Sequence, residues 1–165
     1  MDWLSLYAKK IMEKINTKNF KKTLSKFTTG ITVVCVKNKG KLYGKTVNSF
    51  NSLSLNPPLV LFSLGNYSLS IKTFYESKFL TINILSKNQK NISDYFSKKS
   101  QNSKKIDFSE GDNNTMFIKD CIANLECKLI DKIKKGDHII FVCKVINVKY
   151  NDKLEPLTYY NSKYQ

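Results

Sequence analysis

The sequence contains no arginine. All 28 basic residues are lysines, and with 13 acidic residues they give a formal net charge of +15. A positive charge of this size attracts nucleic acid in general, but dedicated nucleic-acid readers use the planar guanidinium of arginine for bidentate contacts with phosphates and guanine. The lysines are also spread along the chain from Lys9 to Lys163. The composition therefore favours solvated lysines and argues against nucleic acid as a partner.

Cysteine and histidine are scarce. The four cysteines form no C-x-x-C pair and no zinc-finger spacing; they are Cys35, Cys121, Cys127 and Cys143. Two of them, Cys35 and Cys143, lie in apolar strand-like segments, where a free cysteine behaves as a small hydrophobic residue. The only histidine is His138, and no acid–cysteine pattern accompanies it. The sequence therefore predicts no metal site, no disulfide framework and no cysteine–histidine catalysis.

Long apolar runs and glycine-rich nucleotide motifs are also missing. No window approaches the roughly 18 consecutive apolar residues of a membrane span, and neither G-x-G-x-x-G nor G-x-x-x-x-G-K-[ST] occurs, so neither a Rossmann nor a P-loop site can be argued. The first residues, MDWLSLYAKKIMEKI, carry an acid and scattered lysines, unlike a secretory signal. We therefore expect a cytoplasmic protein that folds as a single domain over 1–165, a length that buries roughly 70% of the unfolded surface.

What the sequence does contain is a series of strand patterns. Apolar, β-branched and aromatic segments bounded by turn residues predict strands at 31–37, in the first half of 45–64, and at 59–64, 79–85, 122–133 and 138–150. Helical spacing predicts helices at 16–27, 68–77 and 88–97, and an additional N-terminal helix in 1–15. The span 98–114, rich in lysine, serine and asparagine, is expected to be a mobile loop. Many strands without βαβ alternation predict a mainly β fold, an antiparallel barrel with peripheral helices.

The stretch 45–64, KTVNSFNSLSLNPPLVLFSL, departs from an ordinary core strand. Its first half is crowded with small polar side chains: Thr46, Asn48, Ser49, Asn51, Ser52 and Ser54. Apolar Val47 and Leu53 are odd-numbered, whereas Phe50 between them is even, so the strand phase breaks and a bulge is expected. A solvent-facing antiparallel strand has the same composition as a strand that lines a ligand. The pattern alone leaves both interpretations open.

Five segments follow one another in a recognisable order: FTTGITVV (27–34), GKTVNSFNSLSLNPPLVLFSL (44–64), KTFYESKFLTINIL (72–85), NLECKLIDKIKKGDHIIFVCKVINV (124–148) and PLTYYNSKY (156–164). Together they cover the chain from about Asn19 to the C-terminus. They resemble the flavin reductase family, the FMN-binding split-barrel proteins that serve as reductase components of two-component flavin monooxygenases. The resemblance implies a six-stranded antiparallel Greek-key split β-barrel, a homodimer, and a flavin near the dimer interface that NADH or NADPH reduces.

The resemblance also implies a flavin site. It places FMN or FAD against the polar stretch and the segment before it, at Thr29, Thr46, Val47, Asn48, Ser49, Ser52 and Ser54. It matches Ser68 and Ser70 to a phosphate-binding loop, and it puts Lys78 where family members carry a basic residue beside the phosphate. Read without the resemblance, one of these serines is an ordinary helix cap.

The nicotinamide side of the implied site is smaller. His138, in the turn Gly136-Asp137-His138, is placed beside the nicotinamide of the co-substrate, and Tyr160 is a candidate wall of the same pocket. Without the resemblance, the histidine is a turn residue and the aromatic tail is packing. Hydride transfer requires that the two rings be held at contact distance, with no acid or base. No catalytic residue and no metal are therefore assigned.

The implied function is that of an NAD(P)H-dependent flavin reductase that supplies reduced flavin to a monooxygenase. An alternative on the same barrel is a non-catalytic electron carrier that keeps FMN bound, although the retained turn with His138 favours the reductase. A third interpretation is a basic barrel for single-stranded nucleic acid. Such a protein would interleave aromatic and basic residues on one sheet face, whereas Phe50, Phe62 and Phe79 lie in apolar runs. The sequence leaves open FMN versus FAD, NADH versus NADPH, whether the flavin is a substrate or a bound group, and which enzyme accepts it.

Overall fold

The computed structural model describes residues 16–98 and 106–165. The helix expected in 1–15 and residues 99–105 of the expected loop lie outside the described residues. The helices are α2 (Thr17–Leu24), α3 (Ile71–Glu76) and α4 (Lys90–Ser97), with a short 3-10 helix η1 (Lys87–Gln89) before α4. The strands are β1 (Thr29–Gly30), β2 (Thr32–Asn38), β3 (Lys41–Val47), β4 (Asn51–Leu55), β5 (Pro58–Gly65), β6 (Phe79–Ile84), β7 (Phe108–Glu110), β8 (Met116–Ile118), β9 (Ala123–Lys135), β10 (His138–Tyr150), β11 (Thr158–Tyr160) and β12 (Lys163–Tyr164).

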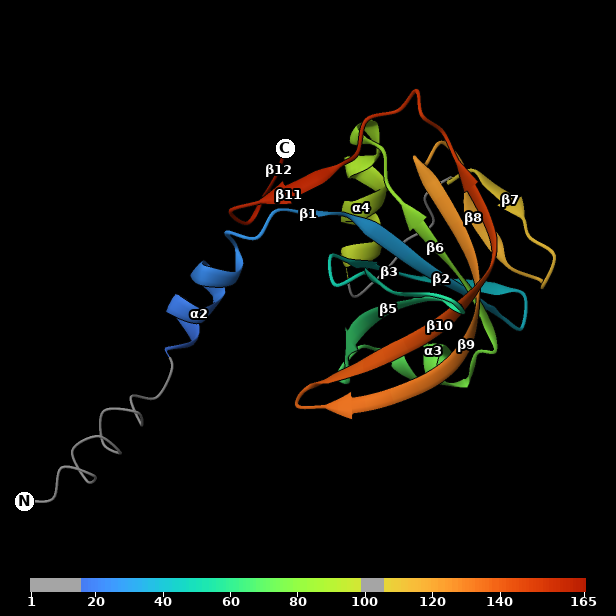
Figure 1. Ribbon diagram of the computed structural model, residues 1–165, viewed down its shortest axis with the longest axis horizontal. Coiled ribbons are helices and arrows are strands. Elements are labelled where there is room, and N and C mark those ends of the chain that lie inside the picture. Colours follow the sequence, from blue (N-terminus) through green and yellow to red (C-terminus); the bar gives the residue numbers. More distant parts are fainter. Residues whose placement is uncertain (1–15, 99–105) are drawn as a thin grey trace, which may run out of the picture.

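The main sheet is antiparallel throughout and curls into a barrel (Figure 1). Its strand order is β3-β2-β6-β9-β10-β5-β4. The expectation of a mainly β, antiparallel fold with few helices is confirmed. The sheet has seven strands rather than the six implied by the resemblance, because the polar stretch folds back on β5 as the short edge strand β4. Pro57 lies in the turn between these two strands, where its lack of a backbone N–H costs no ladder hydrogen bond.

The barrel interior is a dry core formed by inward-facing residues. Along β5, Val60, Phe62 and Leu64 are buried and the residues between them are only partly buried, which is the alternation of a strand with one face inward. The rings of Phe62 and Phe141 stack at 5.1 Å between centroids. Phe74 of α3 is fully buried in the same cluster, so this short helix closes the barrel interior.

A second core cluster lies outside the barrel, between β2 and α4. It contains Cys35, Leu85 and Phe96. Gly44 on β3 has no side chain, and a Cβ at this position would collide with the ring of Phe96. The glycine therefore allows α4 to approach the sheet closely. Since β2 contributes buried residues to both clusters, it is covered on both faces, which explains its continuous apolar sequence.

The N-terminal part of the described chain forms an arm. Figure 1 shows α2 standing away from the barrel, and none of its residues is buried. Asn16 caps the helix, because its side chain accepts a hydrogen bond of 2.9 Å from the N–H of Lys18. The apolar stripe that predicted the helix is exposed: Phe20 by 50%, Leu24 by 56% and Phe27 by 76%. None of the described helices is long and apolar enough to cross a membrane.

The C-terminal tail packs where this arm joins the barrel, as its aromatic composition indicated. Strand β11 pairs with β1, opposite Thr29 and Gly30, and continues through a turn into β12. Leu157, just before β11, is 2% exposed and belongs to the second core cluster. The tail therefore ties the arm to the barrel.

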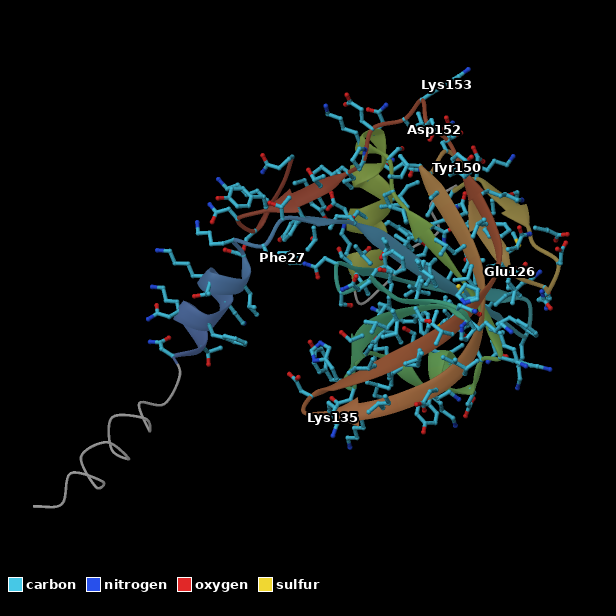
Figure 2. The ribbon with its side chains drawn as sticks, in the orientation of Figure 1. Phe27, Glu126, Lys135, Tyr150, Asp152 and Lys153 are labelled. Carbon is cyan, nitrogen blue, oxygen red and sulfur yellow. The ribbon has the colours of Figure 1, made fainter. Side chains whose placement is uncertain are left out.

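The described part of the expected loop at 98–114 is more regular than expected, because it contains β7, which pairs with β8. This hairpin covers the outer face of β6 and β9 through a polar seam, defined here as Thr81, Asn83, Thr115, Asn124 and Glu126. Glu126 is 1% exposed, and its Oε1 accepts hydrogen bonds from the Thr115 hydroxyl at 2.6 Å and the Asn113 N–H at 3.0 Å (Figure 2). In the described part of the span, Asn113 bonds to Glu126 of the barrel through its backbone N–H and its side-chain amide, a relation that composition does not reveal.

Candidate flavin site

A pocket of about 350 Å³ lies between the arm and the turn from β3 to β4. Its lining residues are Phe27, Thr28, Thr29, Gly30, Thr32, Asn48, Phe50, Asn51 and Ile84. Two of the residues predicted from the resemblance, Thr29 and Asn48, are thus brought together although they come from separate segments of the chain. The Thr29 hydroxyl is buried and has no hydrogen-bond partner within the described chain. A buried hydroxyl without a partner is costly.

The predicted residues Thr46, Val47 and Ser49 are close in sequence, but their side chains are engaged elsewhere. The Thr46 hydroxyl donates to the carbonyl of Ser93 on α4 at 2.6 Å. The Ser49 hydroxyl donates to the carbonyl of Ser63 at 3.1 Å and accepts from the Ser63 N–H at 3.0 Å. Val47 is buried in the barrel core. These three side chains fix the backbone of the turn, and the polar character of the stretch is only partly directed at the pocket.

Ser52 and Ser54 lie further along, on β4, and neither lines the pocket. The ladder between β4 and β5 shifts its register between these two serines. The phase break around Phe50 falls in the turn between β3 and β4, and the register shift lies beyond it on β4. Asn51, which precedes this register shift, is the last residue of the stretch 45–64 that lines the pocket.

Three of the predicted phosphate and nicotinamide residues, Ser68, Ser70 and His138, lie in segments that meet at the end of β5. The N–H of Asn66 donates to the carbonyl of Asp137 at 2.9 Å, and Gly65 is opposite His138 in the ladder. The two serine hydroxyls of the loop, Ser68 and Ser70, are 3.4 Å apart. The predicted phosphate loop and the Gly136-Asp137-His138 turn thus form one continuous rim.

His138 is held in a defined orientation. Its Nδ1 donates to the carboxylate of Asp137 at 2.7 Å, and 43% of its side chain is exposed. The hydrogen bond from His138 holds the pKa of Asp137 below its ordinary value. With Nδ1 occupied in this way, Nε2 is the ring nitrogen left for a ligand.

Lys78 and Tyr160 are not among the residues that line the pocket, although β11, which carries Tyr160, pairs with the pocket segment Thr29–Gly30. Lys78 precedes β6, and the pocket residue Ile84 ends it, so about 20 Å of strand separates them at roughly 3.3 Å per residue. The Lys78 ammonium lies 5.4 Å from the ring centroid of Phe79. Tyr160 is on β11 in the separate three-stranded sheet, with the Lys26 ammonium 5.8 Å from its ring centroid. His138 opens β10 of the barrel sheet, so the two predicted nicotinamide residues belong to different sheets.

Sequence reasoning missed two residues that line the pocket and, outside the pocket lining, one lysine on β3. Phe27 and Phe50 supply apolar walls of the pocket, although the sequence indicated only a helix residue and a core residue. Lys45 alternates along β3 with Tyr43 and Val47, which pack on the barrel core, so it points to the same face. Burial lowers the pKa of Lys45, and it has no ion-pair partner among the described residues. The sequence could have revealed Lys45, because it occupies an inward-facing position in the alternation of this strand.

The cysteines show no sign of nucleophilic chemistry. All four are buried and free. Burial raises the pKa of Cys121 and of Cys143 to about 12, and it raises the pKa values of Cys35 and Cys127 as well. Since only a thiolate is a good nucleophile, these side chains serve as packing.

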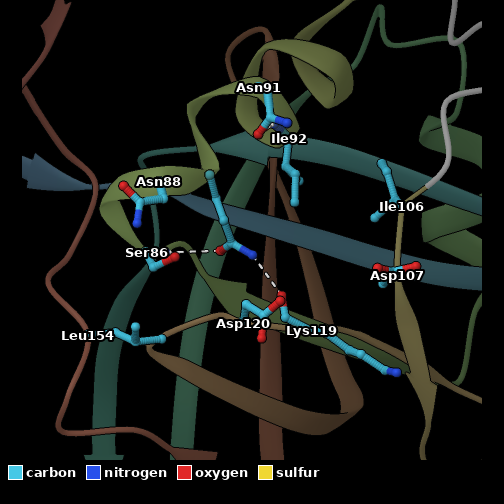
Figure 3. A pocket seen from close by; sticks show the side chains of 10 residues that line it. Ser86, Asn88, Asn91, Ile92, Ile106, Asp107, Lys119, Asp120 and Leu154 are labelled. Atoms are coloured by element: carbon cyan, nitrogen blue, oxygen red, sulfur yellow. Dashed lines mark hydrogen bonds between the residues drawn. The ribbon is translucent and has the colours of Figure 1, made fainter.

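A second pocket, of about 420 Å³, contains none of the predicted residues (Figure 3). It is lined by Ser86, Asn88, Gln89, Asn91, Ile92, Ile106, Asp107, Lys119, Asp120 and Leu154. We call it the Asp120 groove.

Comparison with known proteins gives consistent results. Residues 24–165 match the model of a family described as the flavin reductase like domain. The chain is 34% identical over 137 residues to the FMN reductase (NADH) SmoA of Agrobacterium fabrum, and the match covers 83% of this chain and 79% of the relative. It is 30% identical over 146 residues to the reductase component of 4-hydroxyphenylacetate 3-monooxygenase of Thermus thermophilus, and this match covers 88% of this chain and 93% of that one.

A solved structure agrees over nearly the whole chain. It is that of the NADH:FAD oxidoreductase SgcE6 of Streptomyces globisporus C-1027 in complex with NAD and FAD fragments. The TM-score is 0.86 at 26% sequence identity, with 93% of this chain and 95% of that chain covered. The resemblance drawn from the five sequence segments is confirmed.

Proposed function

The chain belongs to the flavin reductase-like domain family, and we propose that it transfers a hydride from NADH to FMN or FAD in the pocket between the arm and the β3–β4 turn. The names of its relatives support NADH as the donor, and they support both FMN and FAD as acceptors. The observation that carries the proposal is the unpartnered Thr29 hydroxyl, buried beside Asn48 in a pocket with aromatic walls.

The residues present fit a flavin. A bound flavin would supply the hydride acceptor, and the chain would supply the slot that holds it flat. Phe27 and Phe50 offer apolar walls, and Thr29 and Asn48 offer the few polar groups that fix orientation in such pockets. The hydrogen bonds of Ser49 to Ser63 hold the turn at the pocket edge in place. The protein therefore contributes position rather than acid–base chemistry.

His138 and Lys45 have complementary roles in this proposal. His138, oriented by Asp137 and half exposed on the rim, contacts the nicotinamide nucleotide through Nε2. Ser68 and Ser70 on the same rim face the flavin phosphate. Lys45, partly buried and without a carboxylate partner, stabilises the negative charge that the flavin nucleotide brings or acquires on reduction.

The enzyme acts as a homodimer in this proposal, and the arm is part of the interface. Phe20, Leu24 and Phe27 are exposed on the arm, and Phe27 also lines the pocket. An eight-residue helix is marginal on its own, so contact with a second copy would stabilise it and cover the pocket edge. Light scattering should give a dimer for the wild type and a monomer with weaker FMN binding for Leu24→Lys. A dimeric Leu24→Lys protein would contradict this role of the arm.

The reductase is tested by adding NADH or NADPH, in air, with excess FMN or FAD, to the purified protein. Flavin-dependent loss of the reduced nicotinamide, slower in His138→Ala and with weaker flavin binding in Lys45→Met, supports the proposal. A protein that keeps FMN tightly bound without turnover would instead be an electron carrier. The reduced flavin is proposed to serve a monooxygenase, as the name of the Thermus thermophilus relative suggests.

A further inference from the structure

The C-terminal tail, residues 156–165, supports one wall of the candidate flavin pocket. Strand β11 lies beside β1, so that Tyr159 is opposite Thr29, the pocket residue with the unpartnered hydroxyl (Figure 1). Tyr164 on β12 is in turn opposite Tyr159, and their rings meet edge to face with centroids 5.3 Å apart. Thr29, Tyr159 and Tyr164 therefore form one row across three strands, and the place of the Thr29 wall depends on how the tail is held.

Tyr164 also contacts α4, which supports the opposite wall of the pocket. Its hydroxyl lies 2.9 Å from the Ser93 Oγ. The carbonyl of Ser93 accepts a hydrogen bond of 2.6 Å from the Thr46 hydroxyl on β3. Thr46 lies two residues before Asn48, which lines the pocket from the β3–β4 turn. One residue of the tail is thus linked to both walls, through β11 to Thr29 and through α4 to the turn that carries Asn48.

The Tyr164 side chain is held in a defined place on α4. The Lys90 ammonium lies 5.0 Å from the centroid of its ring, and the same ammonium pairs with Asp94 at 2.6 Å. Burial raises the pKa of Tyr164, so the phenol keeps its proton at neutral pH. Ser93 is fully buried, whereas its neighbours Asn91 and Ile92 line the Asp120 groove. Since a buried hydroxyl has no access to water, the bond between Ser93 and Tyr164 is costly to break.

The two walls of the pocket belong to segments that part from each other. They are joined at their base by the last pair of the β2–β3 ladder, in which Thr32 is opposite Val47. Beyond that pair, β1 joins the three-stranded sheet of the tail, and the turn at Asn48 leads to β4 at the edge of the barrel sheet. Because the walls are carried by different sheets, the contacts of the tail with α4 help to set their separation.

We propose that Tyr164 is a positioning residue for the flavin, which holds the wall at Thr29 and the wall at Asn48 at the separation that admits the ring. This inference rests on the proposed function. Tyr164 does not itself line the pocket. It acts through the β12–β11–β1 row on one side and through Ser93 and Thr46 on the other, so the tail contributes to flavin affinity by preorganising the slot.

The test is an FMN titration of the whole protein. Tyr164→Phe keeps the ring on Lys90 and removes the hydroxyl, and it should weaken FMN binding about fivefold, the effect of one hydrogen bond. Ser93→Ala removes the other end of the same bond, so the double variant should bind FMN no more weakly than the weaker single variant. In turnover with NADH, the KM for FMN should rise in Tyr164→Phe by the same factor. The value of kcat and the KM for NADH should change by less than about twofold, because Tyr164 acts on the flavin walls and not on the rim that carries His138.

The matched control is Thr81→Val, which removes a hydroxyl that donates to the Met116 carbonyl at 2.7 Å in the polar seam. It should leave FMN affinity unchanged, and none of these substitutions alters the net charge that attracts the FMN phosphate. Unchanged FMN affinity in Tyr164→Phe would overturn the inference, as would an equal loss in Thr81→Val or additive losses in the double variant. A wild-type protein that binds no flavin would instead contradict the proposed function, and this inference would fall with it.

Discussion

The polar side chains of the seam outside the barrel all bond within the chain, although Glu126 Oε2 is buried without a partner among the described residues, whereas the candidate flavin pocket leaves such side chains unpaired. In the seam, Asn83 is fully buried, and both ends of its amide are engaged. Its Nδ2 donates to the carbonyl of Val33 at 2.9 Å, and its Oδ1 accepts from the N–H of Ile118 at 3.0 Å and from the Asn124 Nδ2 at 2.9 Å. In the pocket, Asn48 is exposed and the buried Thr29 hydroxyl has no partner among the described residues.

The difference separates structural polar groups from those available to a ligand. A buried polar group that finds partners inside the chain fixes the fold, because an unpaired one would cost about 1–3 kcal/mol. A polar group left unpaired in a pocket gains its partner only when a ligand binds. Residue type does not distinguish the two cases: Thr46 and Ser49 belong to the first class and Asn48 to the second, within one short stretch of the chain.

The largest expected effect is in the seam. Asn83→Ala should lower the free energy of unfolding by about 3–5 kcal/mol, because it leaves the Val33 carbonyl, the Ile118 N–H and the Asn124 amide without their partner. Asn48→Ala, the matched change in the pocket, should alter unfolding by less than about 0.5 kcal/mol while weakening FMN binding. Urea unfolding without flavin measures the first quantity, and a flavin titration measures the second. A loss below about 1 kcal/mol in Asn83→Ala would contradict the structural role of the seam.

Glu126 tests the same seam through pH. Burial by itself raises the pKa of this carboxyl, but the hydrogen bonds from Thr115 and Asn113 outweigh it and bring the pKa below its ordinary value of 4.5. A carboxylate with a depressed pKa contributes stability that is present above the unfolded-state value and is lost as the pH falls through the folded-state value.

We therefore expect Glu126→Gln to cost about 1–3 kcal/mol of unfolding free energy at neutral pH and less below pH 4.5, where the wild type loses the same contribution. The measurement is the urea midpoint as a function of pH. Glu155→Gln is the control, because Glu155 is exposed and pairs only with Lys87 at the surface. If the difference in urea midpoint between Glu126→Gln and the wild type stayed constant as the pH fell below 4.5, the ionised form of Glu126 would not be the source of its stabilising effect.

The barrel was predictable from the sequence. Which polar residues bond within the chain, and which are left unpaired in the pocket, was not. Apolar, β-branched and aromatic segments bounded by turn residues predicted β2, β5, β6, β9 and β10 close to their observed bounds. The phase break around Phe50 marked the turn between β3 and β4 rather than the register shift, which lies between Ser52 and Ser54. The hairpin β7–β8 escaped detection because Glu126, a partner of its turn, lies beyond it in sequence.

The site was predictable as a set of residues but not as a geometry. The resemblance identified Thr29 and Asn48, which do share a pocket, whereas Lys78 and Tyr160 do not line it. The hydrogen bonds that engage Thr46 and Ser49 run to Ser93 and Ser63, whose positions depend on the tertiary fold. Local patterns contain no information about such partners.

The smallest and sharpest prediction concerns Thr29, because its two effects should have opposite signs. Thr29→Val keeps the shape of the side chain and removes a buried hydroxyl that has no partner among the described residues. Without flavin, the variant should be as stable as the wild type or more stable by up to about 1 kcal/mol, whereas its affinity for FMN should fall roughly fivefold to tenfold with the loss of one hydrogen bond. Ser49→Ala is the contrast: its hydroxyl bonds twice to Ser63, so the change should lower the free energy of unfolding without flavin by about 1–2 kcal/mol. If Thr29→Val instead lowered stability and left FMN binding unchanged, the Thr29 hydroxyl would be a structural group like those of the seam. The distinction between paired polar groups and those available to a ligand would then fail at Thr29, where it is drawn most directly.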